Sequence, residues 1–166
     1  MATLKASVPV EEYLHMSFEG SDCEFAFGQI VERSVGEKPH SRAQKRLIEL
    51  FSRAGARLHA FPELRLKLAA ELFRIPDLSV FADREPDEDV PSTPPLVVIE
   101  IVSRDDRYTD ILKKLDEYRS WGVPNIWLVD PWLRRLYVYS AGSLSEAPAF
   151  ALTSQQVQLT SAEIFA

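Results

Sequence analysis

The strongest pattern along the chain is a continuous apolar run from Pro95 to Val102, broken by one charge at Glu100. Such a run is typical of a strand that is buried on both faces. Two more apolar segments, 126–129 and 136–139, flank Asp130-Pro131 and predict a pair of strands. The second half of the chain is therefore expected to build the centre of a sheet.

Helical periodicity is found in two segments. From Ser41 to about Ala54, apolar residues recur at the spacing of one buried helical face, and Gly55 stands where a helix would end. The expected buried positions of this helix are Ala43, Leu47, Leu50, Phe51 and Ala54. A second helix is predicted from about Tyr108 to Trp121, before Gly122.

Shorter signals complete the pattern. A helix starting near Ser7 would turn Tyr13 and Leu14 inward, and Gly28-Gln29 predicts a β-hairpin between residues 24 and 33. The remaining expected features are strands over about 57–67 and 73–81, a proline-rich acidic surface loop over 83–95, a strand near Phe150 and a helical turn near Ala162. This order predicts one domain over 1–166 with a mixed α/β or α+β sheet rather than a doubly wound one.

Composition narrows the class of protein. The 166 residues are 46% hydrophobic and 27% charged, an ordinary globular balance. No apolar run reaches the roughly 18 residues of a membrane span, and the first twenty residues lack the features of a secretory signal. Because Cys23 is the only cysteine, an intrachain disulfide and a multi-cysteine zinc site are excluded. We expect a cytoplasmic protein with no membrane partner.

The net charge of −6 argues against generic nucleic-acid binding, which usually requires a basic face. Much of this acidity lies in the segment 83–89, which holds five acidic residues and one arginine. Without that segment the net charge would be −2. The charge therefore weakens a nucleic-acid function without removing it.

Glu100 is the most informative residue because an unpaired carboxylate is costly to bury inside an apolar strand. Side chains alternate along a strand, so Glu100 shares a face with Val98 and Val102. The carboxylate needs a cation, a metal ion or a proton as its partner. A structural salt bridge and a solvated position at the strand end remain alternatives.

Asp77 follows Pro76, which cannot donate to a ladder and therefore favours a bulge, an edge or a strand start. By itself, Pro-Asp is a common turn dipeptide. Together with Glu100 on a nearby strand, Asp77 becomes a candidate ligand for a hard cation such as Mg²⁺.

The helix over 108–121 carries one charge on its inward stripe. The stripe consists of Ile111, Lys114, Leu115 and Tyr118. Lys114 thus faces the core, whereas Lys113 lies nearly opposite and can pair with Glu117. Snorkelling of Lys114, or a helical ion pair with Asp110, would be a purely structural explanation. Two carboxylates and a nearby lysine are what metal-assisted phosphodiester hydrolysis requires.

Four segments in consistent order carry a family resemblance. They are 74–80 (RIPDLSV), 95–103 (PLVVIEIVS), 110–118 (DILKKLDEY) and 122–131 (GVPNIWLVDP). Together they resemble the Uma-two family of restriction-endonuclease-like proteins, within the PD-(D/E)XK nuclease superfamily. The strong match covers about Arg74 to Tyr139, and residues 24–32 and His40 look like the weaker N-terminal part.

The resemblance implies a restriction-endonuclease-like mixed β-sheet flanked by helices, with Asp77 and Glu100 as metal ligands. The superfamily's usual lysine two residues after the glutamate is Val102 here, and Lys114 matches a lysine that the family places on the following helix. By the same resemblance, the carbonyl oxygen of Ile101 is a further candidate ligand. Tyr118 is a candidate contact to the DNA backbone, and Mg²⁺, with Mn²⁺ as a substitute, is the expected cofactor.

The leading hypothesis is a Mg²⁺-dependent endonuclease acting on DNA, with RNA as an alternative substrate. A non-cleaving nucleic-acid-binding module with the same fold and a regulatory protein with structural buried charges are the other hypotheses. His40 is interpreted as a surface residue near a helix cap, with a catalytic acid as the alternative. Glu24 is interpreted either as a hairpin residue or as a group near the metal. Cleavage of both strands needs two sites, which is compatible with a homodimer.

Overall fold

The computed structural model describes residues 7–166. Its helices are α1 (Val10–His15), α2 (Lys38–Ala54), α3 (Tyr108–Trp121) and α4 (Ser161–Ile164), with a 3₁₀ turn at Thr153–Gln155. Its strands are β1 (Glu24–Ala26), β2 (Gln29–Val31), β3 (Leu58–Pro62), β4 (Leu66–Ala69), β5 (Leu72–Arg74), β6 (Leu78–Ala82), β7 (Val97–Ile101), β8 (Asn125–Asp130), β9 (Arg135–Ser140), β10 (Ser143–Ala147), β11 (Ala149–Leu152) and β12 (Val157–Thr160). No helix within this range is long and apolar enough to cross a membrane.

The main sheet has six strands in the order β10-β9-β8-β7-β6-β3. β7 and β8 run parallel, and the other neighbouring pairs of this sheet are antiparallel. A parallel pair needs a long crossover connection, and α3 supplies it between β7 and β8. A second sheet has the order β2-β1-β5-β4, and β11 and β12 form a separate hairpin.

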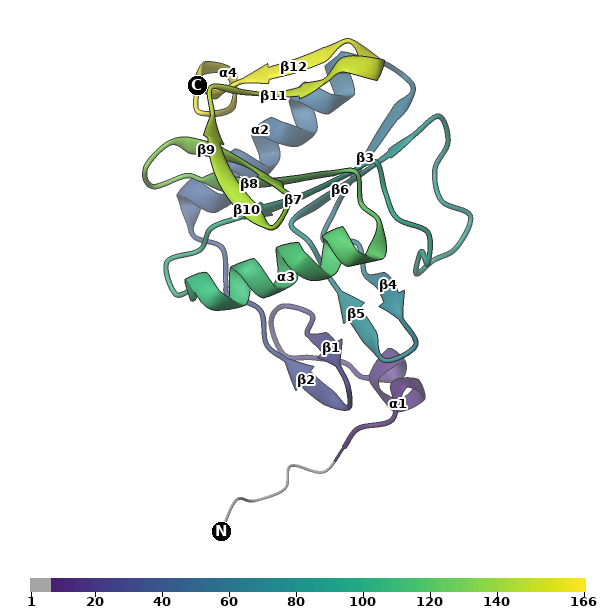
Figure 1. Cartoon of the computed structure of the whole chain (residues 1–166). Helices are drawn as coiled ribbons and strands as arrows, with labels where there is room; N and C mark the ends of the chain where they lie inside the picture. Colours follow the sequence, from purple (N-terminus) through teal and green to yellow (C-terminus); the bar gives the residue numbers. More distant parts are fainter. Residues whose placement is uncertain (1–6) are drawn as a thin grey trace.

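Two helices cover opposite faces of the main sheet (Figure 1). On the face under α2, Phe51 and Trp127 stack at a ring-centroid distance of 6.4 Å, and Phe150 of the hairpin stacks on Trp127 at 4.3 Å. On the opposite face, Leu115 of α3 belongs to a second buried cluster with Val98 of β7. The central strand β7 is buried along its whole length, as the apolar run predicts.

Most elements of the second half are as expected. α3 has the predicted bounds and ends at Gly122 in the left-handed region, and the strand pair after it is β8 and β9. α2 begins at Lys38, three residues before the predicted Ser41, because Pro39 fits the first helical turn. The expectation that Ala54 and Leu14 are buried is wrong, since both are exposed.

The two strands predicted over 57–67 and 73–81 are each divided. The first becomes β3 and β4, which belong to different sheets, and the second becomes β5 and β6. Pro76 lacks the N–H that a continuous ladder would need, and Asp77 follows it directly before β6. The break between β5 and β6 therefore places Asp77 outside both strands. The strands β10 and β12 were not predicted.

Candidate active site

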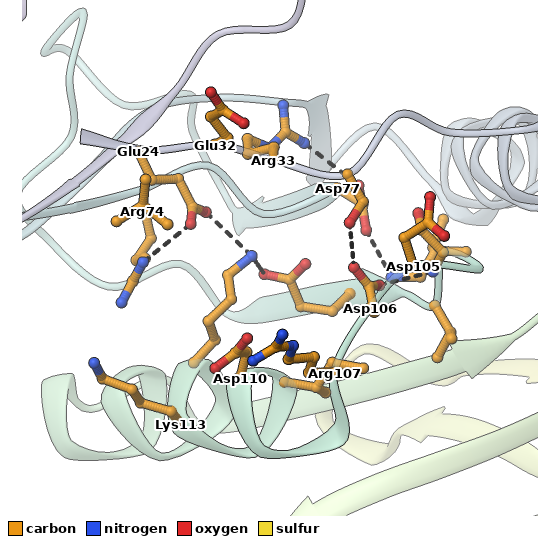
Figure 2. A pocket seen from close by; sticks show the side chains of 18 of the residues that line it. Glu24, Glu32, Arg33, Arg74, Asp77, Asp105, Asp106, Arg107, Asp110 and Lys113 are labelled. Atoms are coloured by element: carbon orange, nitrogen blue, oxygen red, sulfur yellow. Dashed lines mark hydrogen bonds and ion pairs between the residues drawn. The ribbon is translucent and has the colours of Figure 1, made fainter.

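Asp77, Glu100 and Lys114 line one cavity of about 350 Å³. Asp77 comes from the break before β6, Glu100 from β7 and Lys114 from α3. Figure 2 shows the labelled Glu24 and Asp77 on one side of this cavity and Arg107 and Lys113 near the helix. The three residues that the sequence singles out are thus brought together from three separate elements.

Asp77 is 6% exposed and is held by donors from three directions. Its Oδ2 accepts a hydrogen bond from the Ile101 amide at 2.7 Å, and its Oδ1 lies 3.1 Å from Nε2 of His40 and 3.4 Å from a guanidinium nitrogen of Arg33. Burial raises the pKa of Asp77, but His40 and the Ile101 amide lower it by more, so the pKa lies below its usual value. Asp77 is therefore ionised and fixed in orientation.

Glu100 is also buried, yet its environment is less neutralising. Its Oε1 accepts a hydrogen bond from the Tyr118 hydroxyl at 2.7 Å and forms an ion pair with Nζ of Lys114 at 3.1 Å. Burial raises the pKa of Glu100 to about 7, since the lowering by Lys114 is opposed by the charges of Asp77 and Glu24. Tyr118 is fully buried, so its hydroxyl positions Glu100 and has no exposed surface for a DNA contact.

Lys114 bridges two carboxylates. Its Nζ lies 3.1 Å from Oε1 of Glu24 and 3.1 Å from Oε1 of Glu100. Burial lowers the pKa of Lys114, but Glu100 and Glu24 raise it by more, and the ammonium stays charged. The alternative pairing with Asp110 does not occur, because no ion pair joins the two residues within the described chain.

A buried charge network behind Lys114 was not foreseen from the sequence. Glu24 is 2% exposed, and its oxygens accept hydrogen bonds from Arg74 at 3.0 Å and from the Ile75 amide at 2.9 Å. Arg74 also binds both oxygens of Glu117, at 2.7 and 3.0 Å, so the predicted pair of Glu117 with Lys113 is wrong. The available signal was Arg74 itself, a charge inside the apolar segment 72–75.

His40 lies at the active site and not on the surface. It is 6% exposed and contacts Asp77, so the interpretation as a surface residue near a helix cap is wrong. Gly36 lies against the imidazole, because a Cβ at Gly36 would meet Nδ1 of His40 at 2.7 Å. Burial lowers the pKa of His40, but the hydrogen bond to Asp77 raises it by more, which favours the charged imidazolium as the donor to the carboxylate.

The residues present fit a magnesium ion. Such an ion would have few protein ligands, since no group of three or more His, Cys, Asp or Glu side chains within residues 7–166 could hold a metal ion. Mg²⁺ commonly binds through only one or two carboxylates and takes its other oxygens from water and substrate phosphate. Oε2 of Glu100 receives no hydrogen bond from the described residues. Burial, and after it the charges of Asp77 and Glu24, raise the pKa of Glu100, and a bound cation would lower it. Asp77 and Glu100 are therefore the candidate ligands, and Ile101 lines the same cavity.

Comparisons with known proteins bear on the family and the fold. The sequence model of the Uma2 (Uma-two) family, described as "Putative restriction endonuclease", matches residues 10–165. The crystal structure of "a putative nuclease belonging to DUF820" from Anabaena variabilis superposes with a TM-score of 0.79 at 23% identity, covering 93% of this chain and 96% of that chain. This likeness confirms the predicted fold.

A further match has a much lower similarity. The cryo-EM structure of a DrdV–DNA complex has a TM-score of 0.35 and 15% identity, and it covers 76% of this chain and 12% of that chain. No curated protein matches the sequence.

Proposed function

This chain belongs to the Uma2 family, and we propose that it is a Mg²⁺-dependent endonuclease that hydrolyses phosphodiester bonds of DNA. The observation that carries the proposal is the placement of Asp77, Glu100 and Lys114 around one cavity. A buried carboxylate pair that faces a charged lysine suits the binding and hydrolysis of a phosphate diester.

Each of these side chains has a distinct part in the proposed mechanism. Asp77 and Glu100 would hold the metal ion, which on binding neutralises phosphate charge and lowers the pKa of a coordinated water. Lys114 stays protonated, so it cannot act as a base. Its ammonium would instead donate to the attacking water or to the negative charge that develops on the phosphate. Tyr118 keeps Glu100 in place through a hydrogen bond of 2.7 Å.

One observation favours a second candidate, a nucleic-acid-binding protein that does not cleave. Both oxygens of Asp77 already accept hydrogen bonds or ion pairs from protein groups. A carboxylate oxygen can accept more than one contact, so the carboxylate still has capacity for a metal ion. Activity measurements separate the two candidates.

The test is cleavage of plasmid and single-stranded DNA in the presence of Mg²⁺ or Mn²⁺. Asp77→Asn and Lys114→Ala should each abolish most of the cleavage, whereas Asp116→Asn and Lys45→Ala, at exposed positions, should leave it unchanged. DNA that is bound by the unsubstituted protein but remains uncut with either metal would favour the second candidate.

Metal binding is measured separately by thermal unfolding. A ligand that binds only the folded state, at a concentration of about 100 times its Kd, stabilises the folded state by about 2.7 kcal/mol. Mn²⁺ should therefore raise the melting temperature of the unsubstituted protein and not that of Asp77→Asn. An equal rise in both proteins would remove Asp77 from the metal site.

A further inference from the structure

The cationic side chains of this acidic protein are unevenly distributed. Within residues 7–166, eight arginine and lysine side chains have no carboxylate oxygen within 4.0 Å. They are Lys38, Arg42, Arg53, Arg65, Lys67, Arg107, Lys113 and Arg134. In a protein with 25 acidic and 19 basic residues, a cation without an acidic partner is the less expected case, so the places where such cations gather are informative.

Three of the eight line a single hollow, here called the basic hollow. Lys38 and Arg42 come from the first turns of α2, and Arg134 comes from the turn between β8 and β9. The hollow has a volume of about 350 Å³, and none of its lining residues is acidic. Arg134 is held in place, since its guanidinium donates to the carbonyl oxygen of Phe165 at 2.8 Å.

The basic hollow adjoins the active site through α2. His40, which contacts Asp77, lies between Lys38 and Arg42 in the sequence. Residues two positions apart on a helix point in nearly opposite directions, so the hollow and Asp77 lie on opposite sides of the first turns of α2, about 10 Å apart. Figure 1 shows the start of α2, the β8–β9 turn and the start of α3 at the same side of the molecule.

Two more of the eight cations line the active-site cavity itself. Arg107 and Lys113 lie at the start and on the outer side of α3, and Figure 2 labels both beside the cavity. Five of the eight thus line either the active-site cavity or the basic hollow. Repeated cations along an edge match a partner with regularly repeated negative charges, as in the phosphate backbone of a nucleic acid.

We propose that the basic hollow binds backbone phosphates of the DNA whose scissile phosphate lies at Asp77 and Glu100. The proposal rests on the function proposed above and adds the path of the substrate. Successive phosphates of one strand rise by 3.4 Å along the axis of the double helix, so about 10 Å along that axis spans roughly three phosphates. The strand would run from the cavity, past Arg107, across the first turn of α2 to Lys38 and Arg42.

The experiment measures binding of a fluorescently labelled duplex without divalent metal, between about 50 and 200 mM salt. The test variant is Lys38→Ala/Arg42→Ala. The matched control is Arg53→Ala/Lys67→Ala, which removes the same two residue types from exposed positions without acidic partners, at the far end of α2 and on β4. Each phosphate contact contributes about 0.9 to the slope of log affinity against log salt. The test variant should bind more weakly, with a slope shallower by about 2, and the control should match the unsubstituted protein.

The outcomes separate the two proposals. If the test variant and the control variant both bind DNA with the salt slope of the unsubstituted protein, the basic hollow is overturned and the nuclease proposal stands. A complete absence of metal-free DNA binding by the unsubstituted protein would also overturn the basic hollow, and the cleavage assay with Mg²⁺ or Mn²⁺ tests the nuclease proposal separately. Thermal unfolding checks that the test variant is folded, and Lys38→Gln/Arg42→Gln replaces it if it is not, since it removes the same charges and keeps long side chains.

Discussion

Substituting Arg74 by methionine should destabilise the protein strongly, although Arg74 is outside the proposed chemistry. Arg74 is 3% exposed, and its guanidinium makes three hydrogen bonds, one to Glu24 and two to Glu117. Methionine fills similar space but leaves the Glu24 carboxylate buried with Lys114 as its remaining cation. Removing one partner of a buried ion pair typically costs about 3–5 kcal/mol. In a domain of this size, 1 kcal/mol lowers the melting temperature by about 2–4 °C, so a decrease of about 10 °C is expected.

Helix α3, which carries the Glu117 partner of Arg74, also provides a matched control. Arg119 binds Asp116 through two nitrogens, at 3.2 and 3.0 Å, but this pair is exposed to solvent. Arg119→Met should therefore change the melting temperature little, because exposed ion pairs contribute little to stability. Thermal unfolding of Arg74→Met and Arg119→Met under identical conditions tests the difference.

A second variant identifies the cause of the loss. If the cost arises from the uncompensated charge of Glu24, then adding Glu24→Gln to Arg74→Met should recover part of the melting temperature. A decrease in Arg74→Met no larger than in Arg119→Met would refute the reasoning. A double variant that is less stable than Arg74→Met alone would show that the Glu24 charge is not the source of the cost.

Three further predictions concern positions around the site and the N-terminal core. His40→Ala should weaken Mn²⁺ binding by about 10–100-fold, and His40→Gln, which keeps a donor to Asp77, should weaken it less in a calorimetric titration. Gly36→Ala should have an effect like that of His40→Ala, since its Cβ would displace the imidazole; unchanged Mn²⁺ affinity would contradict this. Burial raises the pKa of Tyr13 to about 12, above its unfolded value of about 10. The folded protein therefore retains a proton that the unfolded chain loses, and urea-measured stability should fall as pH rises from about 10 to 12, but less in Tyr13→Phe.

The sequence was informative where local patterns placed a charge in an apolar setting. Glu100 could be identified because it interrupts a strand of aliphatic residues, and Lys114 because it lies on the apolar stripe of a helix. Neither inference needs knowledge of which strands are neighbours. The structure places the two side chains 3.1 Å apart, as expected for a half-buried lysine that needs a carboxylate.

Residues whose roles depend on long-range pairing could not be predicted in the same way. Glu24 meets Arg74 because β1 pairs with β5, placing Phe25 opposite Phe73, and no local signal specifies that pairing. His40 was misinterpreted for a different reason. The predicted start of α2 at Ser41 left His40 outside the helix, whereas the observed start at Lys38 puts it in the first turn, directed at Asp77.

Because Lys114 brings a lysine to the cavity from α3, position 102, two residues after Glu100, can hold a valine. A lysine at position 102 would follow Glu100 on the same face of the chain and line the same cavity. From α3, Lys114 instead reaches carboxylates of two separate strands, Glu24 on β1 and Glu100 on β7. The helical lysine therefore supplies a charge to the cavity and also links the small sheet to the main sheet.

These two roles can be separated by moving the lysine. Lys114→Ala should reduce cleavage by about 10²–10³-fold if its ammonium stabilises charge in the transition state. Adding Val102→Lys should recover about tenfold of that loss, because the charge returns to the cavity. The melting temperature should recover much less, since a lysine directly after β7 restores a cation to Glu100 but leaves Glu24 with Arg74 as its only cation. Recovery of stability without cleavage would mean that Lys114 acts only as a structural link between the sheets.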